Sequence, residues 1–259
     1  MALMGVVNVT PDSFSDGGLY LDADAAIAHG RELATQGAEI LDIGGESTRP
    51  GAEEVSAEEE MARVVPVIRG LAGVAAVSVD TSKLAVAEAA LGAGASIVND
   101  VTALRRDPAI GALCAARDVG LILMHMPGDP RTMQANPVYG DVVDDVKAFL
   151  AERLEVAIDA GADEERIWLD PGIGFGKTLD HNLELLRRLG ELRELGRPLV
   201  VGTSRKSFIG KVDGSPVDER LAGTLASSVL AAAEGADVLR VHDVAEAAQA
   251  MKMAAAILG

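Results

Sequence analysis

The chain has 259 residues, of which 49% are hydrophobic and only 3% aromatic, and its formal net charge is −17. This acidic balance argues against nucleic-acid and anionic-membrane partners, which need a basic surface, and is typical of a soluble cytoplasmic enzyme. No apolar run reaches the ~18 residues that a membrane-spanning helix needs, so no membrane span is expected.

Short apolar runs recur along the whole chain and predict β-strands. They are continuous rather than alternating, which is typical of strands that are buried on both faces of a parallel sheet. In chain order, the predicted strands are residues 3–9, 39–45, 75–81, 96–101, 121–126, 166–172, 198–204 and 237–244.

A helical pattern follows each predicted strand. The predicted helices are residues 21–36, 57–71, 84–94, 107–120, 141–161, 179–196, 220–235 and 245–258. Strict alternation of strand and helix over a chain near the usual ~250 residues predicts a (β/α)8 TIM barrel of the α/β class, with residues 1–259 as a single domain. A doubly wound open sheet is the less favoured alternative.

In such a barrel, functional groups lie where the strands end at their carboxyl side. Asp80, Asn99 and Asp170 end three of the predicted strands. These compact acceptors would suit a flat heterocycle that carries an amino group and ring N–H donors, because charged hydrogen bonds to such an edge are strong. The alternative is that buried acids at strand ends only cap the next helix.

A second set of polar residues at the strand ends suits an anion. Its members are Asn8, Thr48, Arg49, Arg205, Lys206, Arg240 and His242. The basic ones gather after the seventh and eighth strands, where barrels commonly bind phosphate. Arg240 and His242 alternate along the eighth strand, so both should lie on one face. For Arg205, a solvated loop charge is an equally good interpretation.

The segment LDPGIGFGKT, residues 169–178, resembles a phosphate-binding P-loop at first sight. That motif needs a glycine five residues before its Gly-Lys pair, and here this position is Pro171, which has no N–H to donate. We therefore interpret the segment as a glycine-rich barrel loop that brings the backbone close to a ligand. For His125, which ends the fifth predicted strand between two methionines, wall lining and catalysis are equally good interpretations.

Together these motifs resemble those of the dihydropteroate synthases of the folate pathway. The matching segments occur in the family's order and cover almost the whole chain. They are MGVVNVTPDSFSDGG, EILDIGGESTRPGA, VSVDTSK, IVNDV, LMHMPGDPRTMQ, LDPGIGFGKT, HNL, GTSRKSFIG and RVHDV. The resemblance implies that p-aminobenzoate is coupled to the methylene carbon of (7,8-dihydropterin-6-yl)methyl diphosphate, releasing dihydropteroate and diphosphate. It also implies a homodimer.

The resemblance further implies where the two organic substrates bind. The pterin would be held by Asp80, Asn99, Asp170 and Lys206. The p-aminobenzoate site, near Lys206, would be formed by Arg49, Pro50, Phe175 and Ser207.

For the diphosphate, the resemblance implies Asn8 as a ligand of a bound Mg²⁺ ion. Thr48, Arg240 and His242 would contact the diphosphate itself. Because an arylamine is a weak nucleophile and diphosphate a good leaving group, positioning and charge stabilisation matter more than a strong base. The residues expected to take part in catalysis are Asp12, Lys206, Arg240 and His242. Asp12 and Asp16 should come near the cation that develops on the pterin methylene, where negative charge is favourable.

The segments 10–20 and 46–56 are rich in glycine, serine and acids, so we expect them to be mobile in the empty enzyme. Two other functions remain possible for a barrel of this kind. A methyltransferase that moves a methyl group from a folate to a corrinoid would share the pterin acids but would not need STRPG and SRKS. A non-catalytic homologue should have lost Asn8, Asp80 or Lys206, and all three are present.

Overall fold

The computed structural model describes residues 1–10, 23–47, 54–129 and 132–258. Its strands form one eight-stranded parallel sheet in the order β6-β5-β4-β3-β2-β1-β8-β7. The strands are β1 (Ala2–Asn8), β2 (Ile40–Gly44), β3 (Ala76–Asp80), β4 (Ile97–Asp100), β5 (Gly120–Met124), β6 (Ile167–Asp170), β7 (Val200–Val201) and β8 (Val238–Val241). The two edge strands meet at a parallel bridge between Leu169 and Leu199, which completes the predicted TIM barrel.

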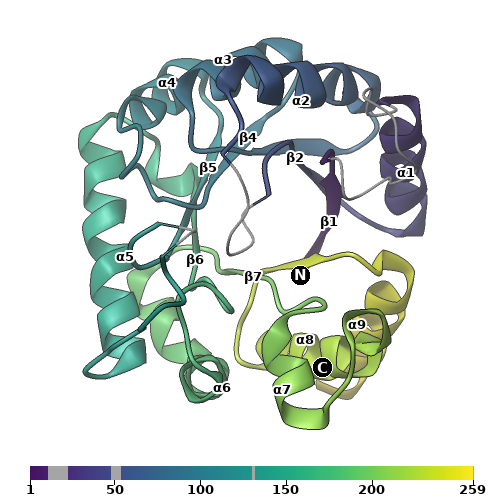
Figure 1. The fold of residues 1–259 in the computed structure, drawn as a ribbon, viewed down its shortest axis with the longest axis vertical. Coiled ribbons are helices and arrows are strands. Elements are labelled where there is room, and N and C mark those ends of the chain that lie inside the picture. Colours follow the sequence, from purple (N-terminus) through teal and green to yellow (C-terminus); the bar gives the residue numbers. More distant parts are fainter. Residues whose placement is uncertain (11–22, 48–53, 130–131, 259) are drawn as a thin grey trace.

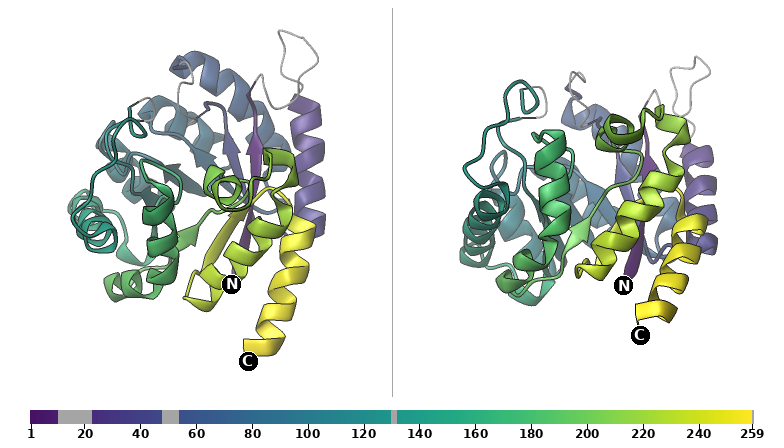
Figure 2. Two further views of the ribbon diagram at one scale, coloured as in Figure 1. Left: turned by 60° about the horizontal axis from the view of Figure 1, so that its bottom comes forward. Right: turned by 90° about the horizontal axis from the view of Figure 1, so that it is seen from below.

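Helices surround the strands as an outer ring (Figure 1). They are α1 (Ala23–Gln36), α2 (Ala57–Leu71), α3 (Leu84–Ala93), α4 (Ala109–Arg117), α5 (Val142–Asp159), α6 (Leu179–Arg187), α7 (Ser207–Asp213), α8 (Leu221–Ala233) and α9 (Val244–Leu258). The two chain ends lie at the same end of the barrel (Figure 2). Among the described helices, none combines the length and the apolar character that crossing a membrane requires.

The structure departs from the sequence prediction in three places. The predicted helix 179–196 ends at Arg187 and continues as a 3-10 helix, Leu189–Leu195, because Arg188 leaves the helical conformation with φ −112° and ψ 21°. Helix α7 was not predicted, since seven residues are too few to show a helical period. The seventh strand, predicted over 198–204, has only two residues in regular pairing.

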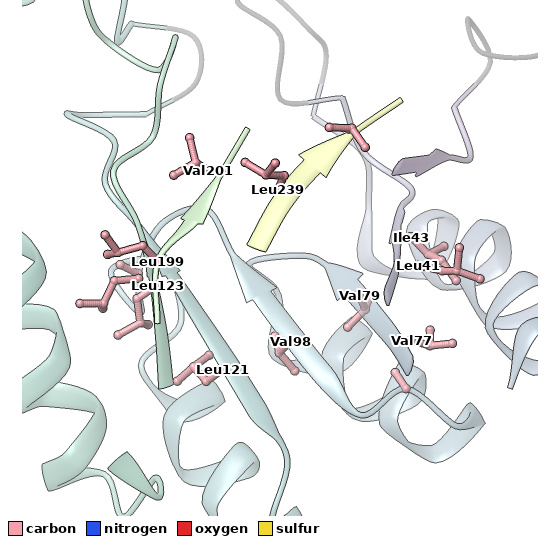
Figure 3. Packing of buried hydrophobic residues seen from close by; sticks show 14 of the residues in the cluster. Leu41, Ile43, Val77, Val79, Val98, Leu121, Leu123, Leu199, Val201 and Leu239 are labelled. Atoms are coloured by element: carbon pink, nitrogen blue, oxygen red, sulfur yellow. The ribbon is translucent and has the colours of Figure 1, made fainter. Parts of the chain in front are cut away.

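Apolar side chains fill both faces of the strands, which explains why the strand sequences do not alternate. Outward-facing residues such as Leu41, Val77, Val98 and Leu121 pack beneath the helices (Figure 3). A separate cluster fills the amino-terminal part of the barrel interior, and it consists of Met4, Ile40, Ile97, Ile122, Val200 and Val238.

Along several strands, the inward-facing positions change from apolar to polar toward the carboxyl end. Two residues separate members on one face of a strand, so Ile97 is followed by Asn99 and Val238 by Arg240. Ile40 is likewise followed by Asp42. The same strands therefore build an apolar floor and a polar mouth.

Candidate active site

A row of paired residues crosses four strands at the mouth of the barrel. Asn8 of β1 pairs with Gly44 of β2, Gly44 pairs with Asp80 of β3, and Asp80 pairs with Asn99 of β4. This register brings together one predicted metal ligand and two predicted pterin ligands from segments far apart in the chain. Gly44 has no side chain, so the row is open between Asn8 and Asp80.

Arg240 is paired with two carboxylates in the barrel interior. Its Nε donates to Asp42 Oδ2 at 2.6 Å and its Nη2 to Asp80 Oδ2 at 2.9 Å. Asn99 Nδ2 also donates to Asp42 Oδ2, at 3.2 Å. Arg240 therefore belongs to both of the sets that the sequence suggested, because it contacts Asp80 of the pterin set.

Asp42 was missed from the sequence. It is fully buried, and its Oδ1 has no hydrogen-bond partner in the described part of the chain. A charged residue in the middle of the apolar strand sequence ILDIG was the available signal, since an unpaired charge there would be costly. Asp42 lies in the middle of β2, so a search of the strand ends alone does not find it.

The pKa values in this cluster follow from burial and from the shared arginine. Burial raises the pKa of Asp80 to about 7, although Arg240 opposes the shift. Burial disfavours the Arg240 cation, but Asp42 and Asp80 outweigh this and raise the pKa of Arg240. The guanidinium therefore stays charged, and the cluster can exchange a proton at Asp80 near neutral pH.

Asp170 and Lys206 interact electrostatically beside the loop that follows β6. Asp170 Oδ1 accepts a hydrogen bond from Gly172 N–H at 2.7 Å, and burial raises the pKa of Asp170 while Lys206 opposes the rise. Lys206 Nζ donates to the Ile173 carbonyl and lies 4.8 Å from the centre of the Phe175 ring. Burial lowers the pKa of Lys206 to about 8.

Lys177, the lysine of the P-loop-like segment, is turned into the protein. Its Nζ donates to the carbonyls of Gly172 and Phe175, each at 2.9 Å, and lies 2.9 Å from His125 Nδ1. The side chain therefore shapes the loop and does not present its charge to a phosphate. Burial lowers the pKa of His125 to about 2, so the neutral imidazole lines the wall.

His242 lies beyond β8, beside the loop that carries Lys206. Its Nδ1 lies 2.9 Å from Ser204 Oγ, which also accepts the His242 backbone N–H at 3.2 Å. Burial and the nearby Arg240 lower the pKa of His242 to about 4, so the ring is neutral at pH 7. An anion bound beside it would favour the protonated form.

Arg205 and Ser207, which flank Lys206 in the sequence, are both exposed. Arg205 forms a salt bridge with Asp243 through both carboxylate oxygens, which agrees with the interpretation as a loop charge. Ser207 is exposed and is the first residue of α7. Asp12, Asp16, Thr48, Arg49 and Pro50 lie outside the described residues, as do most of the segments 10–20 and 46–56.

The described residues also limit how a metal ion could be held. No group of three His, Cys, Asp or Glu side chains within them is arranged to bind a metal. Mg²⁺ prefers oxygen ligands and commonly binds through one or two protein groups together with phosphate oxygens and water. The amide oxygen of Asn8 at the barrel mouth fits that mode of binding.

Comparison with known proteins agrees with this site. Residues 4–242 match the family described as "Pterin binding enzyme". The chain is 48% identical to dihydropteroate synthase of Escherichia coli strain K12, over 99% of this chain and 91% of that protein.

Two solved structures from Xanthomonas albilineans resemble the chain closely. One is dihydropteroate synthase with 4-aminobenzoic acid, with a TM-score of 0.93, 49% identity and coverage of 100% of this chain and 93% of that one. The other is the enzyme in complex with 7,8-dihydropteroate, with a TM-score of 0.90, 46% identity and coverage of 100% and 94%. Together with the match to the pterin-binding family, these similarities show that the chain belongs to the dihydropteroate synthase family.

Proposed function

We propose that the protein condenses (7,8-dihydropterin-6-yl)methyl diphosphate with p-aminobenzoate, giving dihydropteroate and diphosphate. The observation that carries this proposal is the arrangement at the barrel mouth. Acceptors at Asp80, Asn99 and Asp170 lie beside the cations Lys206 and Arg240. The pterin substrate combines a donor-rich ring with an anionic leaving group, which the reaction replaces by the amine of p-aminobenzoate, and binding groups of both kinds are present. The acidic composition supports the cytoplasm as the place of the reaction.

The pterin would be bound by the acceptors on the strands. Its amino group and ring N–H groups would donate to Asp170 and to the amide oxygen of Asn99, while Lys206 would donate to a ring acceptor. Asp170 and Asn99 are both buried, so these hydrogen bonds would form away from water, where they are strong. Asp80 can act as acceptor or donor because its pKa is about 7.

The diphosphate would be bound on the side of β1 and β8. His242 would donate to it after taking up a proton, and Arg240 would supply positive charge from within the barrel. Asn8 would hold Mg²⁺, which when bound would neutralise charge on the leaving diphosphate. The chain's own contribution is to fix the anion while positive charge develops on the pterin methylene.

The p-aminobenzoate would lie over Phe175, close to Lys206 and the start of α7 at Ser207. The ring of Phe175 already lies beside the Lys206 ammonium, so an aromatic carboxylate could stack on one and pair with the other. Attack by the neutral amine then depends on placement next to the pterin methylene.

Calorimetry can separate the two halves of this site. His242→Ala should weaken binding of a pterin diphosphate by about tenfold, the typical cost of a lost charge-assisted hydrogen bond. Binding of the same pterin without phosphate should stay nearly unchanged. Equal loss for both ligands would place His242 in the scaffold. Arg240→Ala should weaken the binding of both ligands, because it removes the cation that pairs with Asp42 and Asp80.

We also propose that the protein is a homodimer that pairs through α7 and α8. A groove of about 530 Å³ lies between α6, α7 and α8, and its apolar lining includes Leu183, Phe208 and Leu230. Val212 and Leu230 are large apolar residues at this groove, and each is 63% exposed. A second copy of the same face would cover them.

Sedimentation velocity tests the dimer. Leu230→Glu should convert it to a monomer, because a charge cannot be buried in an apolar interface without a partner. Ile257→Glu on α9, where the side chain is 74% exposed, is the matched control and should leave the dimer intact. The reverse result would place the interface on α9.

A further inference from the structure

Asp42 is a buried carboxylate to which the proposed reaction gives no role of its own. It lies in β2 and is fully buried. Its Oδ2 accepts two hydrogen bonds, from Arg240 Nε at 2.6 Å and from Asn99 Nδ2 at 3.2 Å. Both donors come from side chains that the proposed function assigns to the substrate. Asp42 therefore contacts two proposed binding residues without being a proposed ligand itself.

The register of the sheet places Asp42 deeper in the barrel than Asn99. Across β3, Gly44 of β2 is level with Asn99 of β4. Asp42 lies two residues before Gly44 on the same face of the strand, and in the same way it is level with Ile97, a residue of the apolar floor. The hydrogen bond from Asn99 Nδ2 to Asp42 therefore runs from the level of the mouth toward the floor.

This hydrogen bond determines how the amide of Asn99 is turned. A carboxylate has no proton to donate, so the NH2 group of Asn99 must face Asp42. The amide oxygen Oδ1 is on the other branch of the same planar group, and it therefore faces away from Asp42 and the floor. Within the ranges that the structure describes, the hydrogen bond to Asp42 is the only one that the Asn99 side chain makes. Oδ1 is thus available as an acceptor for a ligand.

The same carboxylate also orients Arg240. The Arg240 guanidinium is paired with Asp42 through Nε and with Asp80 through Nη2, so two carboxylates fix its plane. Asp42 Oδ1 has no hydrogen-bond partner in the described part of the chain, which makes the buried charge costly. Apolar residues often stabilise such a position as well or better, so a buried ion pair is better explained where it fixes a geometry.

We infer that Asp42 is a positioning residue for the pterin. By holding the NH2 group of Asn99, it presents the amide oxygen to the ring, so that this point of the site accepts a hydrogen bond and does not donate one. A ligand with an N–H donor facing Asn99 is then preferred over a ligand with a lone pair there. The inference rests on the proposed function, which assigns Asn99 to the pterin.

Removal of the acceptor at position 42 tests the inference. Asp42→Leu introduces an apolar side chain of similar size, so the amide of Asn99 becomes free to turn. The affinity for a phosphate-free pterin, measured by calorimetry, should fall by about tenfold, the typical effect of a lost hydrogen bond in a buried site. Asp42→Asn keeps an oxygen that can accept from both Asn99 and Arg240, so this variant should bind the pterin several-fold more tightly than Asp42→Leu.

A second substitution, at position 99, separates the turn of the amide from a general loss of stability. Asn99→Asp gives a group that presents an acceptor oxygen whichever way it is turned. In the wild type it places a second carboxylate against Asp42 and should weaken pterin binding. In the Asp42→Leu background the same substitution should strengthen pterin binding, because it restores the acceptor where no carboxylate remains at position 42. Such a reversal of sign requires that the two side chains interact.

Asp100→Asn is the matched control for the loss of a buried charge. Asp100 follows Asn99 in β4 and is also a fully buried carboxylate. Its oxygens, however, accept the N–H groups of Thr102 and Leu104 and do not contact the Asn99 amide. Asn99→Asp should therefore weaken pterin binding in the Asp100→Asn background, as it does in the wild type.

A third measurement needs no variant. The two donors share one carboxylate oxygen, so the side-chain NH2 protons of Asn99 should show NOEs to the Nε proton of Arg240 in NMR spectra of the wild type. These NOEs should persist when the pterin is bound. If they were absent, or were replaced on binding by NOEs from the NH2 group to pterin protons, the inference would be wrong even if Asp42→Leu did not fold.

The outcomes separate the inference from the proposed function. Equal pterin affinity in Asp42→Leu and the wild type would overturn the inference, and so would a harmful effect of Asn99→Asp in both backgrounds. An equal loss in Asp42→Asn and Asp42→Leu would assign the effect to charge alone and overturn it as well. A wild-type protein that binds no pterin would contradict the proposed function itself. Loss of pterin binding in Asp170→Asn but not in Asp42→Leu would contradict only the inference.

Discussion

Asp170 and Asp100 are both buried carboxylates at the carboxyl ends of strands, yet their partners differ. Asp100 Oδ1 accepts the Thr102 N–H and Oδ2 accepts the Leu104 N–H, so both oxygens are used by the following turn. Asp170 uses Oδ1 for the Gly172 N–H and lies beside Lys206. Capping explains Asp100, whereas Asp170 has an environment that suits a ligand.

Asp170→Asn should therefore reduce the affinity for a pterin analogue by about ten- to a hundredfold, because a charged hydrogen bond is replaced by a neutral one. Calorimetry measures this directly. Asp100→Asn is the matched control, and it should lower the free energy of unfolding while leaving pterin affinity nearly unchanged. If Asp170→Asn kept full affinity, Asp170 would belong to the scaffold.

Lys206 should set an upper pH limit on the reaction. Burial lowers its pKa to about 8, so the ammonium is present below that pH and is lost as the pH rises through it. We expect kcat/KM for the pterin diphosphate to fall above about pH 8, since this ratio reports the ionisation of the free enzyme. In Lys206→Arg, the fall should move beyond the measurable range, although the absolute rate should be lower. If kcat/KM of the arginine variant fell at the same pH as that of the wild type, the fall would be due to the ionisation of another group.

At the scale of elements, the loop after β6 is shaped by glycines and by an inward lysine. Gly172 has φ +67°, and a Cβ there would lie 1.9 Å from the His125 carbonyl oxygen. Lys177 holds the carbonyls on either side of this turn. The loop thereby presents Ile173 and Phe175 to Lys206.

Gly172→Ala should destabilise the protein by more than ~2 kcal/mol, because an L-residue is strained at this φ and its methyl group overlaps backbone. Gly92→Ala in α3 is the control. Apart from its chain neighbours and the backbone of α3, no described atom lies within 4 Å of a Cβ at that position, so the change should raise stability by up to ~1 kcal/mol through helix propensity. Chemical denaturation compares the two, and equal effects would refute the strain at Gly172.

The elements that the sequence predicted well are those with a long periodic or apolar pattern. In strand β1 and helix α5, the buried residues follow a run or spacing that can be recognised in the sequence. Helix α7 is too short to show such a pattern, and the end of α6 at Arg187 coincides with long-range side-chain contacts. Arg188 binds Glu191 at 2.8 Å and Asp141 at 2.8 Å, and the contact with Asp141 spans residues far apart in sequence.

The same distinction applies to the site. Residues at the ends of strands, such as Asp80 and Asp170, could be found because parallel strands must bring their carboxyl ends together. The pairing of Arg240 with Asp42 could not, because it depends on the stagger of the barrel, which sets Arg240 level with Met4 and not with Asn8. Tertiary pairing of this kind leaves no local pattern.

At the scale of the whole molecule, one barrel combines an apolar floor with a polar mouth. Its eight parallel strands close at the bridge between Leu169 and Leu199, so the acceptors of β3, β4 and β6 and the cations that follow β7 and in β8 surround a common space. In the proposed reaction, the pterin and its diphosphate would be bound from opposite sides of the mouth. The closed sheet would bring the groups for both into reach of one another.

The most direct test is to measure both products from (7,8-dihydropterin-6-yl)methyl diphosphate and Mg²⁺, with and without p-aminobenzoate. We predict that diphosphate and dihydropteroate form in equal amounts, and only when p-aminobenzoate is present. Diphosphate release that does not depend on p-aminobenzoate would make the protein a hydrolase. Tight pterin binding without any release would contradict the proposed reaction and favour a barrel that only binds pterins or transfers a methyl group.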